Sequence, residues 1–175
     1  MLIRPETEPD HAAIRGVVVG AFGSDVEGDL VERIRSSPEY IPELSLVAEA
    51  DDRIVGHVMI SGAVVRGRAG DRPIVMLSPL AVAPDHQRRG VGGALVRTVC
   101  GLADECGEPL VVLEGSPAFY GRFGFVHSER HGLSIDLPGW APPEAAQVRV
   151  LSSYDPTDTR LRGRVVYPAA FDGLD

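Results

Sequence analysis

The chain has 175 residues, a length that suits one domain with one hydrophobic core. Its 17 basic and 25 acidic residues give a formal charge of 17 − 25 = −8, which argues against a general nucleic-acid-binding protein. No apolar run is long enough for a transmembrane helix, and the first residues lack the apolar core of a signal peptide. We therefore expect a cytoplasmic protein that does not bind membranes.

The first third of the chain carries the pattern of a strand, two helices and a hairpin. Thr7 and Asp10 can cap a first helix, which Gly23 ends. Ser24 and Glu27 have the spacing of a second capping box, in which each side chain bonds a backbone N–H. The predicted segments are a strand at 2–4, apolar helix stripes at 14–22 and 30–34, strands at 44–49 and 54–61, and a hairpin turn at 50–53.

Two residues of the second hairpin strand suggest special roles. Gly56 marks a point where another element packs closely against the strand. His57 has a reference pKa near neutrality and can serve as a base. A lone histidine in an apolar strand is more often a hydrogen-bonded core residue, and this interpretation is favoured.

The middle of the chain reads as a strand, a turn and a helix. Ile74 to Val82 is apolar, and Pro84 with Asp85 indicates a turn. Apolar residues then recur every three or four positions from Val91 to Cys106, as on one face of a helix. Cys100 lies about 9 Å from Cys106 along that helix, too far for a disulfide. We expect reduced cysteines and no metal site.

The junction before this helix, Gln87 to Gly93, has the chemistry of a phosphate site. Helix N-termini present unpaired N–H groups and positive potential, and glycines let an anion approach the backbone. Arg88 and Arg89 add fixed positive charge. The Lys and Ser/Thr of a P-loop are absent, and Leu95 occupies the place of the third glycine in a dinucleotide fingerprint.

Gln87-x-x-Gly90-x-Gly92 instead resembles the acetyl-CoA motif of the GNAT N-acetyltransferases. A second match, Pro117 to Phe125 with Tyr120 at its centre, resembles a later region of that family. The similarity covers residues 1–127 and is strongest to a bacterial branch of predicted acetyltransferases. We expect a single domain over residues 1–175, with a GNAT core at 1–127 and C-terminal strands and loops at 128–175.

The resemblance implies an α/β acyl-CoA N-acyltransferase fold. Its mixed central sheet is flanked by helices and splayed between strands 4 and 5, where pantetheine bonds the freed backbone. Pro79, which cannot donate a ladder hydrogen bond, fits that separation. The implied cosubstrate is acetyl-CoA, and the implied contacts are Leu80, Ala81, Val82, Gln87, Arg88, Arg89, Gly90, Val91, Gly92 and Gly93.

The implied chemistry is direct acetyl transfer to a primary amine within a ternary complex. A phenol is protonated at neutral pH, so Tyr120 can give its proton to the departing thiolate. Because the first two helices form one wall of the acceptor site in GNAT folds, Glu27 becomes the candidate acid facing the amine. Glu114, His57 or a water chain remain alternatives for the base. Packing alone would be the ordinary role of Tyr120.

The last third of the chain reads less clearly. Strands are predicted at 133–137, 147–151 and 164–167. Trp140 is interpreted as a hydrophobic plug beneath a loop rather than as a lining of the acceptor pocket.

The acceptor is expected to be an amine-bearing small molecule or a peptide or protein amine, and a homodimer is left open. Two other classes of function also remain. A non-catalytic acyl-CoA-binding or sensor protein would keep the phosphate turn without the chemistry, although Tyr120 argues against it. A nucleotide or nucleotide-sugar enzyme could use the same turn. The absence of the third glycine of the dinucleotide fingerprint and of the P-loop lysine argues against that class.

Overall fold

The computed structural model describes residues 1–174 and divides into two compact units. The first contains Met1–Ser61, Leu77–Leu102 and the segment from Ala169 onward, and the second contains Gly62–Met76 and Ala103–Pro168. Strands β3 (Arg53–Gly67) and β4 (Gly70–Val82) run through both. Within residues 1–174, every helix is too short or too polar to span a lipid bilayer.

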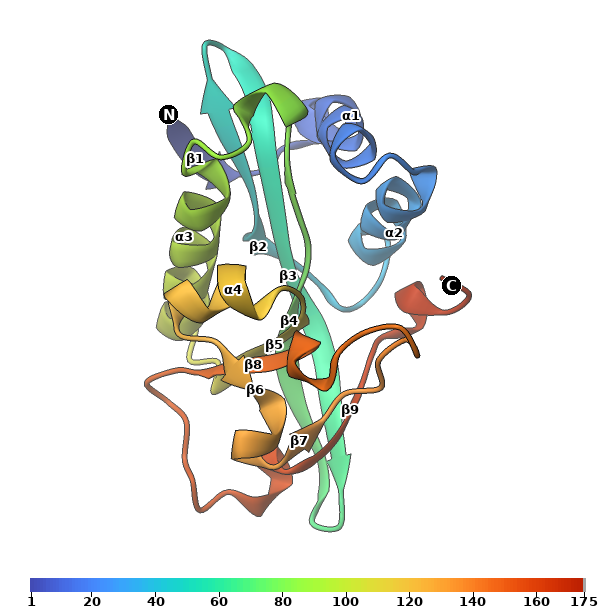
Figure 1. Ribbon diagram of the computed structural model, residues 1–175, viewed down its shortest axis with the longest axis vertical. Helices are drawn as coiled ribbons and strands as arrows, with labels where there is room; N and C mark the ends of the chain where they lie inside the picture. The colour runs from blue at the N-terminus through green and yellow to red at the C-terminus, as the bar shows by residue number, and fades with distance from the viewer. Residues whose placement is uncertain (175) are drawn as a thin grey trace. The chain divides into compact units, whose positions relative to one another are not determined.

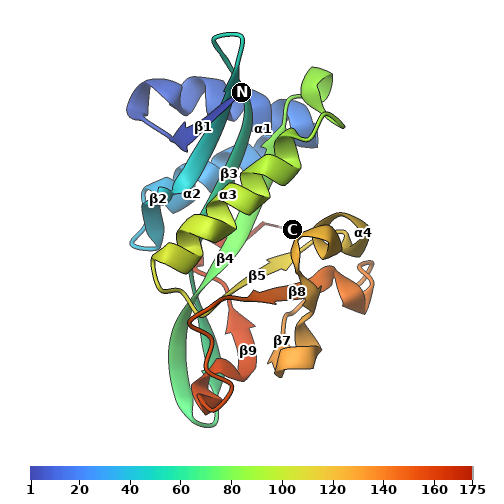
Figure 2. The same ribbon diagram turned by 90° about the vertical axis from the view of Figure 1, so that its left-hand side faces the viewer.

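The first unit is a sheet with helices on both faces. Strand β1 (Leu2–Pro5) pairs antiparallel with β2 (Tyr40–Ala50), and β2 pairs antiparallel with β3. Helices α1 (His11–Phe22) and α2 (Asp25–Arg35) lie on one side of β2 and β3, and α3 (Val91–Glu105) lies on the other (Figures 1 and 2). The core against α1 and α2 is formed by Ile14, Val17, Val18, Leu30, Val31, Ile34, Val47, Met59 and Ala81.

Local signals set the boundaries of these elements as predicted. Gly23 ends α1 with a φ of 70°, a left-handed conformation that glycine adopts without steric cost. Ser24 begins α2 by accepting a hydrogen bond from the Val26 N–H. Asp51 and Asp52 form the hairpin turn with φ values of 51° and 57°.

Gly56 allows α3 to approach the sheet closely, as expected. A β-carbon at this position would lie 2.9 Å from Leu95 Cδ1 and 3.0 Å from Val91 Cγ1. Both partners belong to the apolar face of α3, and both are buried. Any larger residue at position 56 would therefore force the helix away from the strand.

The second unit is a mixed sheet of short strands. Strand β5 (Leu110–Glu114) pairs antiparallel along its whole length with β8 (Ala146–Val150), which also pairs with β6 (Val126–His127). Strand β9 (Gly163–Val166) pairs antiparallel with β3 and parallel with β7 (Leu133–Ser134). The unit also contains α4 (Pro117–Tyr120), toward which β5 runs (Figure 2).

Short 3-10 helices complete the described chain, at Glu8–Asp10, Pro84–His86, Gly121–Phe123, Ser128–His131, Pro143–Ala145, Thr159–Leu161 and Ala169–Phe171.

The parallel pairing of β4 with β5 is short. It joins Val75 to Val111 and Met76 to Val112, and the ladder ends there, before Pro79. A proline has no N–H to donate, so a regular ladder cannot continue unchanged through that residue. The hydrogen-bonded pairing of β4 with β5 therefore ends before Pro79, which agrees with the predicted separation of these two strands.

Three predictions about the later segments were wrong in detail. The strands predicted at 54–61 and 74–82 are longer than expected, because β3 continues to Gly67 and β4 begins at Gly70. The strand expected at 133–137 is only two residues long, and β6 was not predicted. Trp140 is 85% exposed, so it is not a plug beneath a loop.

Candidate functional site

The turn between β4 and α3 is held by hydrogen bonds to β3 and to the end of β4. The Ala83 N–H donates to the Val55 carbonyl at 2.8 Å, and Gln87 Nε2 donates to the Val82 carbonyl at 3.0 Å. Arg88 and Gly90 have φ values of 61° and 85°, both in the left-handed region. A non-glycine residue in that region is uncommon, so the backbone at Arg88 has an unusual conformation.

This turn presents donors and positive charge at one place. The Ala94 N–H makes the first helical bond of α3, to the Gly90 carbonyl at 3.0 Å. The N–H groups of Val91, Gly92 and Gly93 come before that bond and have no intrahelical acceptor. Exposed Arg88 and Arg89 lie just before these residues, separated from them by Gly90. This arrangement fits a phosphate or pyrophosphate group.

The other predicted cofactor residues lie in the same continuous segment. Leu80, Ala81 and Val82 are the last residues of β4, and Ala81 is buried in the core of the first unit. The structure thus brings all ten predicted cofactor residues together as one strand, turn and helix start, from 80 to 93.

Glu27 lies in the first turn of α2, also in the first unit. Ser24 Oγ accepts from the Val26 N–H, so Ser24 caps the helix, but the predicted reciprocal bonds between Ser24 and Glu27 are not formed among the described residues. Glu27 Oε2 is buried, and among residues 1–174 no group hydrogen-bonds to it. A carboxylate oxygen removed from water without a partner is costly, so this atom is suited to accept a hydrogen bond from a ligand.

Tyr120 belongs to the second unit, where an aromatic cluster holds its ring. The ring meets Phe119 and Phe125 edge to face, with centroids 4.8 and 5.7 Å apart. Ser116 caps this short helix by accepting from the Phe119 N–H. The tyrosine is half-buried, and its ring position depends on packing.

Glu114, an alternative base, has a partner in the second unit. Tyr167 Oη donates to Glu114 Oε1 at 2.6 Å. Burial, together with this hydrogen bond, raises the pKa of Tyr167, so the phenol remains protonated and stays a donor. The contact gives Glu114 a structural role as a hydrogen-bond acceptor.

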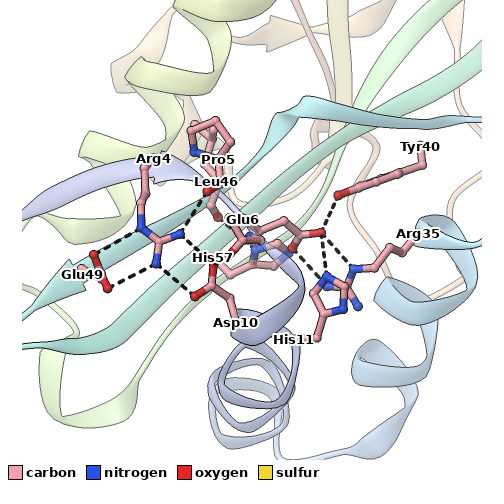
Figure 3. A network of polar contacts seen from close by, with 11 residues as sticks. Arg4, Pro5, Glu6, Asp10, His11, Arg35, Tyr40, Leu46, Glu49 and His57 are labelled. Carbon is pink, nitrogen blue, oxygen red and sulfur yellow. Dashed lines mark hydrogen bonds and ion pairs between the residues drawn. The ribbon is translucent and has the colours of Figure 1, made fainter.

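A buried polar network in the first unit was not predicted from sequence (Figure 3). The Glu6 side chain is 1% exposed and accepts from Arg35 Nε at 2.9 Å, Arg35 Nη2 at 3.0 Å and Tyr40 Oη at 2.6 Å. Burial alone would raise the pKa of Glu6, but the bonds from Arg35 and Tyr40 outweigh it and lower the pKa. Burial and the Glu6 carboxylate raise the pKa of Tyr40 to about 12.

This network connects elements that are distant in sequence. Glu6 follows β1, Arg35 ends α2 and Tyr40 begins β2. His11 Nε2 at the start of α1 lies 3.8 Å from Glu6 Oε1. Beside it, Arg4 joins Asp10 at 2.7 Å and Glu49 at 3.2 Å (Figure 3). Together these contacts anchor the helix pair that carries Glu27 to the sheet.

His57 is fully buried on β3, as the core interpretation requires. Its Nδ1 lies 2.9 Å from the Leu46 carbonyl, so Nδ1 carries the hydrogen and Nε2 is left as an acceptor. Among residues 1–174, no group hydrogen-bonds to Nε2. Burial lowers the pKa of His57 to about 4, so the ring is neutral near pH 7.

This buried imidazole should make the fold acid-sensitive. The pKa of His57 in the folded state lies below the unfolded value of 6.5. Between these two pKa values the unfolded chain binds a proton at His57 and the folded protein does not, so the free energy of unfolding falls as the pH drops below 6.5 toward 4. We expect the free energy of unfolding to fall by about 2 kcal/mol more between pH 7 and pH 5 in the wild type than in His57→Gln. Urea unfolding of both proteins at the two pH values measures this difference, and equal losses would contradict it.

The mixed sheet, its flanking helices and the glycine-rich turn before α3 define the class of GNAT-fold N-acyltransferases. The sequence profile described as an acetyltransferase (GNAT) domain matches residues 2–128. The chain belongs to this GNAT acetyltransferase family.

Two curated relatives from Escherichia coli carry the name uncharacterized N-acetyltransferase. YjhQ is 36% identical over 116 residues, which cover 66% of this chain and 64% of YjhQ. YhbS is 35% identical over 140 residues, which cover 79% of this chain and 81% of YhbS. The match to YjhQ therefore spans slightly less than two thirds of that protein.

Solved structures give the same fold. The crystal structure of Escherichia coli YhbS in complex with CoA matches with a TM-score of 0.84 and 31% identity, over 99% of this chain and 93% of that one. A GNAT acetyltransferase from Brucella melitensis in complex with acetyl-CoA matches with a TM-score of 0.76 and 30% identity, over 98% and 97%.

Proposed function

We propose that the protein transfers the acetyl group of acetyl-CoA to a primary amine by direct attack in a ternary complex. The observation that carries this proposal is the turn from Gln87 to Gly93, where two exposed arginines stand next to the N-terminus of α3. Family membership supports it, as do the complexes of similar proteins with CoA and acetyl-CoA.

In this proposal, the turn and the end of β4 bind the cosubstrate. The α3 N-terminus and Arg88 hold the pyrophosphate, while the backbone from Leu80 to Val82 bonds the pantetheine arm. A backbone N–H near Ala81 or Val82 polarises the thioester carbonyl.

The proposed chemistry needs three proton transfers. Glu27 removes a proton from the incoming ammonium. Its Oε2 has no hydrogen-bond partner among residues 1–174, which supports that role. The neutral amine attacks the thioester carbon, the carbon–sulfur bond breaks, and Tyr120 gives its proton to the thiolate. The second proton on the attacking nitrogen then leaves through solvent and restores the Tyr120 phenol, so that a neutral amide and the CoA thiol are the products. His57 is a poor candidate for the base because it is fully buried.

Ligand binding separates this proposal from the other classes of function. Acetyl-CoA should raise the melting temperature of the protein, whereas ATP and NAD at equal concentration should leave it nearly unchanged. Stabilisation by ATP or NAD but not by acetyl-CoA would favour a nucleotide enzyme. Stabilisation by acetyl-CoA without acetylation of any amine would favour a non-catalytic acyl-CoA-binding protein.

We expect Gly92→Val to weaken acetyl-CoA binding by 10-fold or more, about 1.4 kcal/mol. The branched side chain would place carbon atoms where the phosphate approaches the helix start. Isothermal titration of the folded variant measures the loss. Gly101→Val is the matched control in the same helix, because a β-carbon at Gly101 meets nothing within 4 Å. Wild-type affinity in Gly92→Val would rule out phosphate binding at this turn.

A further inference from the structure

Gly115, between β5 and α4, leaves room for the ring of Tyr120. A β-carbon at Gly115 would lie 2.5 Å from Tyr120 Cε2 and 2.8 Å from Tyr120 Cδ2. Gly115 is not among the residues with a left-handed backbone, so its conformation does not demand glycine. Glycine is required at position 115 because the aromatic ring of Tyr120 approaches the backbone so closely.

The backbone of Gly115 is held on both sides. Its N–H donates to the Ala145 carbonyl at 2.9 Å, and its carbonyl accepts from Gln147 Nε2 at 2.9 Å. Gln147 lies in β8 and is 1% exposed, which is unusual for a glutamine. Because a buried polar group without a partner is costly, the bond from Gln147 resists movement of the Gly115 peptide.

The Tyr120 ring is therefore packed against a backbone that is held in place by hydrogen bonds. Gly115 lies against one edge of the ring, while Phe119 and Phe125 meet it edge to face. A methyl group added at Gly115 cannot be accommodated by the pinned backbone, so the ring must move instead.

We propose that Gly115 and Gln147 are positioning residues, which fix the ring of Tyr120 and hence the place where its hydroxyl delivers a proton. This inference rests on the proposed function, because it gives Tyr120 the role of general acid. Gln147 acts through Gly115, and Gly115 acts through the ring. Displacement of a catalytic group by about 1 Å can lower the rate by as much as 100-fold.

The experiment is a double-mutant cycle of Gly115→Ala and Tyr120→Phe. Initial rates of thiol release from acetyl-CoA are measured with ethylamine, a small primary amine, as the acceptor. Gly115→Ala should lower kcat by about 10-fold and leave the KM for acetyl-CoA within 2-fold of wild type. In the Tyr120→Phe background, Gly115→Ala should have almost no further effect on kcat, because the hydroxyl that Gly115→Ala would displace is absent.

Gly121→Ala is the matched control, since its β-carbon would meet nothing within 4 Å and its φ of −57° suits alanine. A crystal structure of Gly115→Ala should show the Tyr120 ring displaced. Gln147→Leu should lower kcat in the same direction, again only when Tyr120 is present.

The outcomes separate the two claims. If Tyr120→Phe lowers turnover but Gly115→Ala matches wild type, or if the two effects multiply, the positioning role is refuted and the proposed acid stands. If Tyr120→Phe keeps wild-type turnover, the acid role fails and the positioning role fails with it. An unmoved Tyr120 ring in the Gly115→Ala structure would also overturn the inference.

Discussion

Replacing Tyr120 by phenylalanine is expected to lower turnover by about 100-fold while acetyl-CoA affinity remains nearly unchanged. The phenyl ring keeps the edge-to-face contacts with Phe119 and Phe125 and still fits against Gly115. The hydroxyl group is lost, and with it the proton that Tyr120 would donate. Without it, the thiolate must leave unprotonated, and the barrier to cleavage of the carbon–sulfur bond rises.

The three roles considered for Tyr120 predict different results. A residue that serves only for packing would tolerate phenylalanine in both binding and turnover. A residue that anchors the cosubstrate would lose affinity without a change in the chemical step. Tyr154→Phe is the control, because Tyr154 is another half-buried tyrosine with an edge contact, to His131. Turnover of Tyr120→Phe equal to wild type on an amine that the enzyme acetylates would end the assignment as acid.

Glu6→Gln is expected to destabilise the fold by about 3 kcal/mol, because it leaves the Arg35 guanidinium without a counter-charge in a buried site. The Arg35 side chain is only 13% exposed, so water cannot replace the lost carboxylate fully. The change also weakens the hydrogen bond from Tyr40. Urea unfolding at pH 7 measures the free-energy difference.

Asp71→Asn provides the comparison for an exposed ion pair. Asp71 pairs with Arg66 at 3.3 Å, but more than half of each side chain is exposed. Such pairs contribute about 0–1 kcal/mol. A loss in Glu6→Gln no larger than that in Asp71→Asn would show that the network does not anchor the helix pair.

The parts of the chain that were predicted well depend on neighbours in sequence. The strand, turn and helix from 74 to 105 could be read because the apolar period changes at Gly90 and prolines and glycines mark the turn. Gly23 and Ser24 likewise specify where one helix ends and the next begins through their own backbone preferences.

The parts that were missed depend on contacts between distant segments. Glu6 contacts Arg35, which is 29 positions away in the sequence, and Tyr40, which is 34 positions away. No local sequence pattern predicts either contact. Gln147 reaches Gly115 across 32 positions, from a strand whose pairing with β5 is set by the tertiary fold. Trp140 was misjudged because a large apolar residue usually favours burial, whereas here it lies in an exposed loop.

Two-substrate steady-state kinetics can decide whether the acetyl group is transferred within a ternary complex. Thiol release should be measured over a matrix of acetyl-CoA and amine concentrations, with an amine selected from a panel. We expect thiol release to require the amine and the double-reciprocal lines to converge, because both substrates are bound when the amine attacks. Parallel lines would indicate an acetylated enzyme intermediate and would contradict direct attack in a ternary complex.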